Sequence, residues 1–270
     1  SGLESVVYRT YEAAQAGTPG LWLDYVTPAE LDAGLILNPY LSDAYLRQRR
    51  ALLPGPVFDH YHRNAWGSAG GTYLSADVIA ACRVDYALPQ TPEEASEFLA
   101  HWGGGHCLAV AGGLDRAQPF AKGDDSVWCA VAALPGNAGP VLWLVGLDVM
   151  PTGSEAEVLA CIGRTWSIWG PTPAIFEAFQ SADIAYKCGA DLRHASGPAQ
   201  SSLFSYVHRL ATAGRLRFPA GPEGDLLARQ LAGFRVDTST AIPTFSGGKG
   251  KGVDDAVYAL GWACEKAREQ

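Results

Sequence analysis

The chain has 270 residues, which is enough for one large domain or for one domain with an extension. It is 48% hydrophobic and 18% charged, the balance of an ordinary globular protein with ample material for a core. Its net charge of −8 argues against tight DNA binding by this chain alone, because nucleic-acid binders usually carry a basic surface. The charge does not exclude a nuclease whose acids gather in one site.

The cysteines and the apolar runs argue against a zinc-binding, a disulfide-rich or a membrane-spanning protein. No two of the six cysteines form a C-x-x-C pair, so we expect reduced core residues and neither zinc ligands nor a disulfide framework. No signal peptide is visible, and apolar runs such as 140–150 are too short to span a membrane. The chain starts Ser-Gly without Met, so we expect further residues upstream.

The first hundred residues predict a mainly helical arm. Helices are expected over 4–16, 42–53 and 75–82, and an aromatic-rich segment covers 57–66. Pro, Gly and Asn interrupt the rest, and no long apolar pattern supports an independent core. We therefore predict that residues 1–100 form a linker or arm and that residues 101–270 form the main domain.

From about residue 106 the pattern becomes that of an α/β protein. Three apolar runs over 107–114, 126–134 and 140–149, separated by turns, predict an antiparallel meander with a buried middle strand. A fourth strand is expected at 174–179, and the whole predicts a mixed central sheet flanked by helices. The remaining expected elements are helices over 154–166, 181–188, 200–213 and 226–232, a short edge strand at 216–219, and a loop or hairpin over 234–252.

The last helix opens with two adjacent carboxylates, Asp254 and Asp255, after a loop that carries Lys249 and Lys251. Acids at a helix start also cap free N–H groups, so the pair needs distant partners before it indicates a site. A buried stripe is predicted behind them by apolar residues at helical spacing, Val253, Val257, Leu260 and Cys264.

Two further acids end or interrupt apolar strands. Asp115 closes the first predicted strand, and Glu177 lies in the fourth, where an acid is costly to bury unless it is paired. If these strands are neighbours, the two carboxylates face each other. Like charges about 4 Å apart repel by ~4 kcal/mol at an effective dielectric near 20, and a divalent cation reverses that sign. Oxygen-only ligands favour Mg²⁺ or Mn²⁺ over zinc.

Other charged residues have an ordinary interpretation beside a functional one. We interpret Asp124 and Asp125 as turn residues and Asp148 as a strand-terminus acid. His194 and His208 lack metal-ligand spacing. The candidates for contact with a DNA backbone are basic residues that solvated turns could equally explain: Arg116, Lys122, Lys249 and Lys251.

The order of these motifs resembles a known family. A strand ending in Gly-Leu-Asp, a strand with an acid, and a final Gly-Lys-Gly-Val-Asp-Asp-Ala-Val-Tyr-Ala-Leu-Gly-Trp-Ala helix are similar to the nuclease domain of the large terminase subunit of tailed double-stranded DNA bacteriophages. The segment Phe58-x-x-Tyr-x-x-Asn64-x-Trp66 is similar to the family's linker between motor and nuclease. Val253 replaces the usual His, and Tyr258 replaces a later Asp. The resemblance covers roughly residues 40–270.

The resemblance implies an RNase H-like fold and a metal-dependent endonuclease that cuts concatemeric viral DNA during genome packaging in the host cytoplasm. It implies two divalent ions, Mg²⁺ or Mn²⁺, held by Asp115, Glu177 and Asp255 with Asp254 assisting; the sequence leaves open which of the adjacent pair binds. The implied partners are double-stranded DNA, the ATPase half of the same protein, the small terminase subunit and the portal. The chain has no G-x-x-x-x-G-K-[ST] phosphate loop, so we expect the ATPase half to lie outside it.

Two alternatives remain open. Another RNase H-like nuclease, such as a junction resolvase or a transposase core, shares the acids but does not explain the aromatic linker segment. A docking module of a packaging machine with little activity of its own is favoured somewhat by the net charge of −8.

Overall fold

The structure is a computed structural model. It describes residues 6–19, 26–33, 42–63, 71–117, 125–151, 153–179, 181–239, 242–247 and 254–270. No described helix is both long enough and apolar enough to cross a membrane. All six cysteines are free; four of them are buried, and Cys107 and Cys188 are half-buried.

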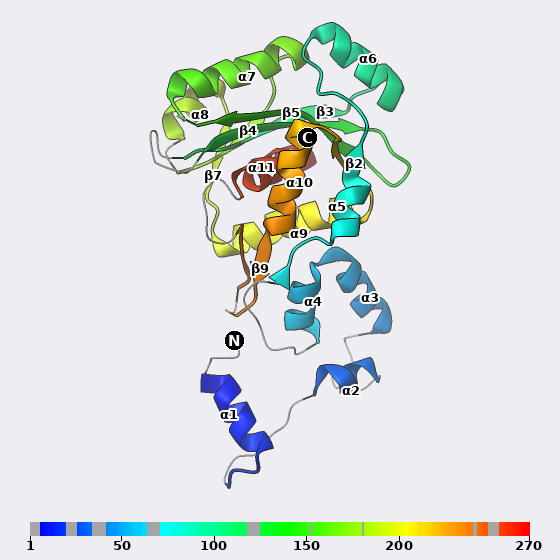
Figure 1. Ribbon diagram of the computed structural model, residues 1–270, viewed down its shortest axis with the longest axis vertical. Helices are drawn as coiled ribbons and strands as arrows, with labels where there is room; N and C mark the ends of the chain where they lie inside the picture. The colour runs from blue at the N-terminus through cyan, green and yellow to red at the C-terminus, as the bar shows by residue number, and fades with distance from the viewer. Residues whose placement is uncertain are drawn as a thin grey trace.

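A seven-stranded mixed sheet forms the centre of the molecule, in the order β2-β8-β5-β4-β3-β6-β7 (Figure 1). The pairs β3–β4 and β4–β5 are antiparallel, which confirms the predicted meander. The outer strands run parallel to their neighbours, which confirms the predicted mixed α/β sheet. The strands are β2 (Arg83–Val84), β3 (Ala109–Asp115), β4 (Ser126–Leu134), β5 (Val141–Met150), β6 (Ala174–Glu177), β7 (Asp191–Arg193) and β8 (Leu216–Pro219).

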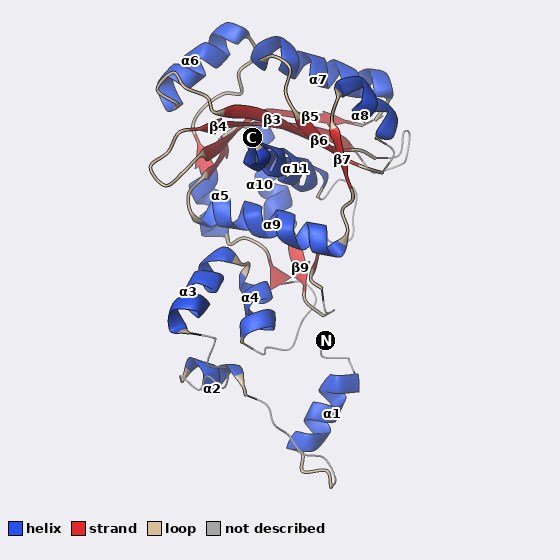
Figure 2. Cartoon of the chain, turned by 180° about the vertical axis from the view of Figure 1, so that it is seen from behind, coloured by secondary structure: helices blue, strands red, loops and turns tan. Residues whose placement is uncertain are grey.

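Helices cover both faces of this sheet (Figures 1 and 2). One face carries α6 (Pro92–Trp102), α7 (Glu155–Trp169) and α8 (Ala182–Cys188). The other carries α5 (Ala76–Cys82), α9 (Gly197–Thr212), α10 (Pro222–Gly233) and α11 (Asp255–Glu269).

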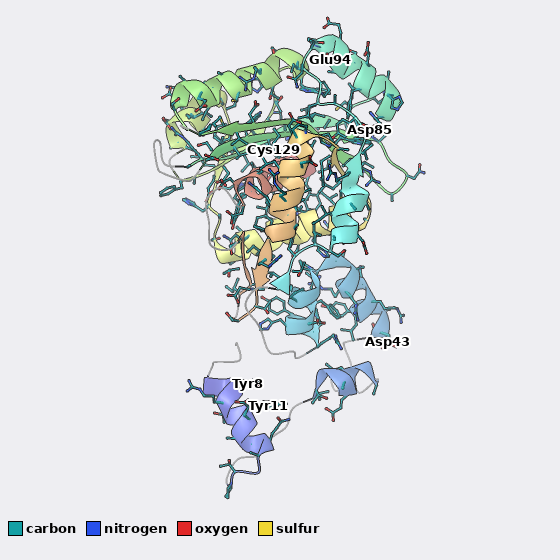
Figure 3. The ribbon with its side chains drawn as sticks, viewed as in Figure 1. Tyr8, Tyr11, Asp43, Asp85, Glu94 and Cys129 are labelled. Carbon is teal, nitrogen blue, oxygen red and sulfur yellow. The ribbon has the colours of Figure 1, made fainter. Side chains whose placement is uncertain are left out.

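The middle strand β4 is buried along its whole length, as predicted. Because side chains alternate along a strand, Val127 and Cys129 enter the core beneath α11, whereas Trp128 and Ala130 enter the cores beneath α6 and α7. Figure 3 labels Cys129 inside the molecule and Glu94 on the outer helix α6. The two sides of the sheet are thus separate cores.

The last helix is buried almost all round. Val257, Leu260 and Cys264 of the predicted stripe are each fully buried. Most other residues of its first ten positions are buried too, because α9 and α10 pack on the side away from the sheet. Val253, the first member of the stripe, lies outside the described residues.

The arm contains α1 (Val6–Gln15), α2 (Pro28–Asp32), α3 (Asp43–Leu52) and α4 (Gly55–His62). Figure 3 places Tyr8 and Tyr11 on α1, away from the sheet. Nearer the main body, α3 packs on α9, and Val57 of α4 belongs to the core beneath α11. The domain boundary near residue 100 remains a proposal; Phe98, just before it, is buried in the core that α6 covers.

The structure differs from the sequence-based expectations at β8 and at elements that the sequence analysis did not predict, among them α4, α6 and β7. Strand β8 does not lie at an edge, as the sequence predicts, but between β5 and the two-residue strand β2. Its Pro219 is the last residue of the strand, where a missing N–H is tolerated. Helix α6 forms where the sequence analysis predicts no element. The loop or hairpin expected at 234–252 contains an antiparallel pair, β9 (Arg235–Asp237) and β10 (Thr244–Ser246), and β1 (Gly71–Thr72) joins it in a small second sheet.

Candidate metal centre

Asp115 and Glu177 end neighbouring parallel strands. The register of β3 and β6 pairs Gly112 with Ala174, Gly113 with Ile175 and Leu114 with Phe176. One further step aligns Asp115 with Glu177, because the offset between paired residues equals their separation in sequence (177 − 115 = 62). The expectation that these two strands are neighbours is confirmed.

Both carboxylates belong to the face of the sheet that α11 covers. Leu114 and Phe176 enter the core on the α7 side, whereas Ile175 enters the core on the α11 side. Since successive side chains of a strand point to opposite faces, Asp115 and Glu177 share the face of Ile175.

Gly113 allows α11 to lie directly on β3. A Cβ at this position would sit 2.1 Å from the carbonyl oxygen of Ala259 and 2.4 Å from the amide nitrogen of Ala263. The bare glycine therefore sets how closely the helix approaches the strand, and the helix brings its first residues toward the acids at the strand ends.

The two aspartates at the start of α11 have different surroundings. Asp254 is the N-cap residue but makes no side-chain cap; its Oδ2 accepts a hydrogen bond of 2.8 Å from the amide of Gly247. Asp255 is only 7% exposed. The amide of Ala256 donates instead to Oε1 of Gln230 on α10, at 2.8 Å. The simple interpretation of Asp254 as a side-chain helix cap is therefore wrong.

The acids influence one another electrostatically. Burial raises the pKa of the Asp115 carboxyl well above its ordinary value, and the hydrogen bond to Glu177 and the charges of Glu177, Asp255 and Asp254 raise it further. Ionising this buried carboxyl is costly because it adds a negative charge beside other acids. The structure thus brings together the four acids that the sequence singled out.

Tyr258 also lies beside this group, and the sequence analysis did not select it as a site residue. Burial raises the pKa of its hydroxyl, and the charges of Asp254, Asp115 and Glu177 raise it further. The hydroxyl donates to the carbonyl oxygen of Phe245 at 2.9 Å. Its spacing of four residues from Asp254, which puts both on one helix face, was the available signal.

The chemistry of the donor set fits a hard divalent cation, because every candidate ligand is a carboxylate oxygen. Burial is the main cause of the raised pKa of Asp115, and repulsion among the acids adds to it; a bound cation would relieve that repulsion. In the part of the chain that the structure describes, no three His, Cys, Asp or Glu side chains converge closely enough to hold an ion as they lie.

Other candidate residues lie elsewhere. Arg116 has a buried side chain that pairs with Asp183 of α8 at 3.0 Å. Asp148 pairs with Arg164 of α7 at 2.6 Å, on the sheet face opposite the acids, so it is a structural partner rather than a fifth member of the group. The remaining candidates, Lys122, Asp124, Lys249 and Lys251, lie outside the described residues.

No protein-family model matches this chain, and no curated protein matches its sequence. Its structure is similar to the large terminase of a thermophilic bacteriophage, which was solved in more than one crystal form. One form aligns with 97% of this chain at 9% identity and a TM-score of 0.59. Another, in complex with ADP, aligns with 100% at 10% identity and a TM-score of 0.58. The HK97 bacteriophage large terminase aligns with 95% of this chain at 12% identity and a TM-score of 0.53.

This chain spans 58%, 61% and 59% of the length of those three chains, respectively. With identities this low, the similarity concerns the fold. It agrees with the seven-stranded mixed sheet and its two helical layers. The chain has the RNase H-like α/β fold of phage large terminases.

Proposed function

We propose that this chain is the nuclease part of a phage large terminase, a divalent-metal-dependent endonuclease that cuts concatemeric viral DNA during packaging in the host cytoplasm. The observation that carries the proposal is the meeting of two strand ends and a buried helix start, which gather Asp115, Glu177 and Asp255 on one face of the sheet.

Each acid has a proposed role. Asp115, Glu177 and Asp255 hold the ions, Mg²⁺ or Mn²⁺, which when bound supply an activated water and charge stabilisation for the leaving oxygen of a phosphodiester. Asp254 assists, and its carboxylate also accepts the hydrogen bond from the amide of Gly247. Tyr258 holds β10 against the same helix through Phe245.

The partners are proposed on the same basis. Double-stranded DNA is the substrate, and Lys122, Lys249 and Lys251 are candidate contacts to its backbone. Arg116 is a weaker candidate because its guanidinium is buried against Asp183. The solved large terminases are longer than this chain, which supports an ATPase half of the same protein as a partner, with the small terminase subunit and the portal completing the machine.

The test is cleavage of plasmid DNA with Mg²⁺ or Mn²⁺ by the parent chain and by Asp115→Asn and Asp255→Asn. We expect both variants to lose cleavage and retain the fold. Asp148→Asn is the matched control, because its carboxylate lies on the opposite face and should leave cleavage unchanged. Unchanged cutting by both site variants would contradict the proposal. Cutting of branched junctions in preference to linear DNA would favour the resolvase alternative.

The docking-module alternative rests on the net charge of −8. It predicts that the 270-residue chain does not cut even with Mn²⁺, whereas a longer protein with its motor half does. The same plasmid assay on both proteins separates the two functions.

A further inference from the structure

A second candidate site lies at the other end of α11. A cavity of about 560 Å³ opens between the arm helices α3 and α4, the outer side of α9 and the C-terminal end of α11. Asp255 and Arg268 are near opposite ends of this 15-residue helix, which makes the helix ~20 Å long at 1.5 Å per residue. The cavity is therefore separate from the acid group. Figure 2 shows α3 and α4 below α9 on the same side of the molecule.

The cavity gathers positive charge in an acidic protein. Arg49, Arg209 and Arg268 line it, and both Arg209 and Arg268 lie over the ring of Tyr206, at 5.1 and 4.9 Å from its centroid. Arg268 is paired with Glu265. Among the described residues, neither Arg49 nor Arg209 forms an ion pair, and the Nε of Arg49 is buried without a hydrogen-bond partner.

Small side chains on α9 keep this space open. Pro198, Ser201, Ser202 and Ser205 recur at i, i+3, i+4 and i+7, which places them on one face of the helix. Serine leaves room that a larger residue would fill, and its hydroxyl can donate to an anion. The α9 wall of the cavity thus presents hydroxyl and guanidinium groups, while Leu52, Leu53 and Ile242 line it on other sides.

The basic surface continues beyond this cavity. A neighbouring cavity of about 530 Å³ shares Tyr206 and Arg268 and adds Arg215. Burial raises the pKa of the Tyr206 hydroxyl, while the charges of Arg215, Arg268 and Arg209 lower it. Three guanidinium groups therefore surround this phenol, an arrangement suited to a ligand with more than one negative charge.

We propose that the cavity between α3, α4, α9 and α11 binds the phosphate and base of a nucleotide, either free or within a single strand. Guanidinium groups recognise phosphate through paired N–H donors, and Arg49 and Arg209 have no carboxylate partner among the described residues that would compete. Tyr61 is 48% exposed and offers a ring face for a base. The volume lies in the range of small-ligand sites. This inference does not depend on the nuclease proposal.

The experiment is isothermal titration calorimetry of the full 270-residue chain in EDTA, so that no divalent metal binds at Asp115, Glu177 and Asp255. The probes are ADP, inorganic pyrophosphate and a short oligodeoxythymidine. The test variants are the double substitution Arg49→Gln/Arg209→Gln and the single Ser202→Asp, which puts a negative charge into the wall. Arg229→Gln is the matched control, because Arg229 lies on α10 and does not line the cavity.

We expect at least one probe to bind one-to-one. Each lost charged contact costs about tenfold in affinity, so the double variant should bind ~100-fold more weakly. Ser202→Asp should weaken binding as well, and the control should stay within about twofold. Binding of ADP assigns the site to a free nucleotide, and binding of the oligonucleotide alone assigns it to a strand. If circular dichroism shows that the double variant does not fold, the binding measured for Ser202→Asp tests the proposal. Absence of binding by all probes, or binding that the folded site variants leave unchanged, would overturn the inference.

Discussion

Gly113 lies where β3 touches α11, and a methyl group there has no room. Its Cβ would lie 2.1 Å from the carbonyl oxygen of Ala259, whereas ordinary contacts begin near 3.4 Å. Gly113→Ala therefore requires the helix backbone to retreat by about 1.3 Å (3.4 − 2.1). Overpacking a core costs typically 1–3 kcal/mol, and backbone yields less than a side chain, so we expect a loss of about 3 kcal/mol in the free energy of unfolding.

Urea denaturation of the metal-free chain measures this loss, with two alanine variants for comparison. A Cβ at Gly163 of α7 would have no atom within 4 Å, so Gly163→Ala should gain roughly 0.5–1 kcal/mol. A Cβ at Gly112 would lie 2.0 Å from the Trp128 ring on the opposite face, so Gly112→Ala should also lose stability.

The two strand variants differ in what they displace. Gly113→Ala moves α11, which carries Asp255, away from Asp115, so among folded variants it should weaken Mn²⁺ binding more than Gly112→Ala does. A free energy of unfolding for Gly113→Ala within about 0.5 kcal/mol of the parent would refute the close contact of helix and strand on which this description of the site depends.

Three further predictions concern charge. The folded state raises the pKa of Asp115, so this carboxyl destabilises the fold at any pH above its pKa in the unfolded chain, about 4. Asp115→Asn should therefore raise the Tm of the metal-free chain by a few degrees above about pH 4, and it should abolish stabilisation by Mn²⁺. Thermal melts with and without Mn²⁺ measure both effects. Burial lowers the pKa of His208 from 6.5 to about 4, so unfolding takes up a proton in this range and roughly 2–3 kcal/mol of stability should be lost as the pH falls from 6.5 to 4. His208→Gln should flatten that loss in urea titrations, and an equally steep loss would contradict the assignment. Asp255→Ala should weaken Mn²⁺ binding more than ~10-fold by calorimetry and Asp254→Ala only a few-fold, because the Asp254 carboxylate already accepts a hydrogen bond from the amide of Gly247; the reverse order would exchange their roles.

The parts of the site that could be predicted are those that a short stretch of sequence identifies by itself. Asp115 follows an apolar run, and Glu177 is an acid within another, so their position in these runs was enough to select them. The register of β3 and β6 then aligns them. The apolar stripe of α11 likewise indicates a buried helix without knowledge of its partners.

The parts that were missed depend on tertiary partners or on very short elements. The edge position expected for β8 was wrong because its neighbour β2 has only two residues, too few to give a strand signal. Gln230 supports the start of α11 from a different helix, a contact that no spacing in the sequence reveals.

Helix α6 is a different kind of miss, since the sequence marks its start. Thr91 is followed by Pro92 and two glutamates, a common N-terminal signature, and the Thr91 hydroxyl accepts from the amide of Glu94 at 3.2 Å. The apolar residues behind it, including Phe98, reach the core beneath α6.

The central claim is that the two strand ends and the start of α11 form one divalent-metal site. A crystal soaked in Mn²⁺ tests it most directly through anomalous density. We expect density within coordination distance, roughly 2.0–2.3 Å, of carboxylate oxygens of Asp115, Glu177 and Asp255. Bound Mn²⁺ located only elsewhere, or no density among these acids at saturating Mn²⁺, would contradict it.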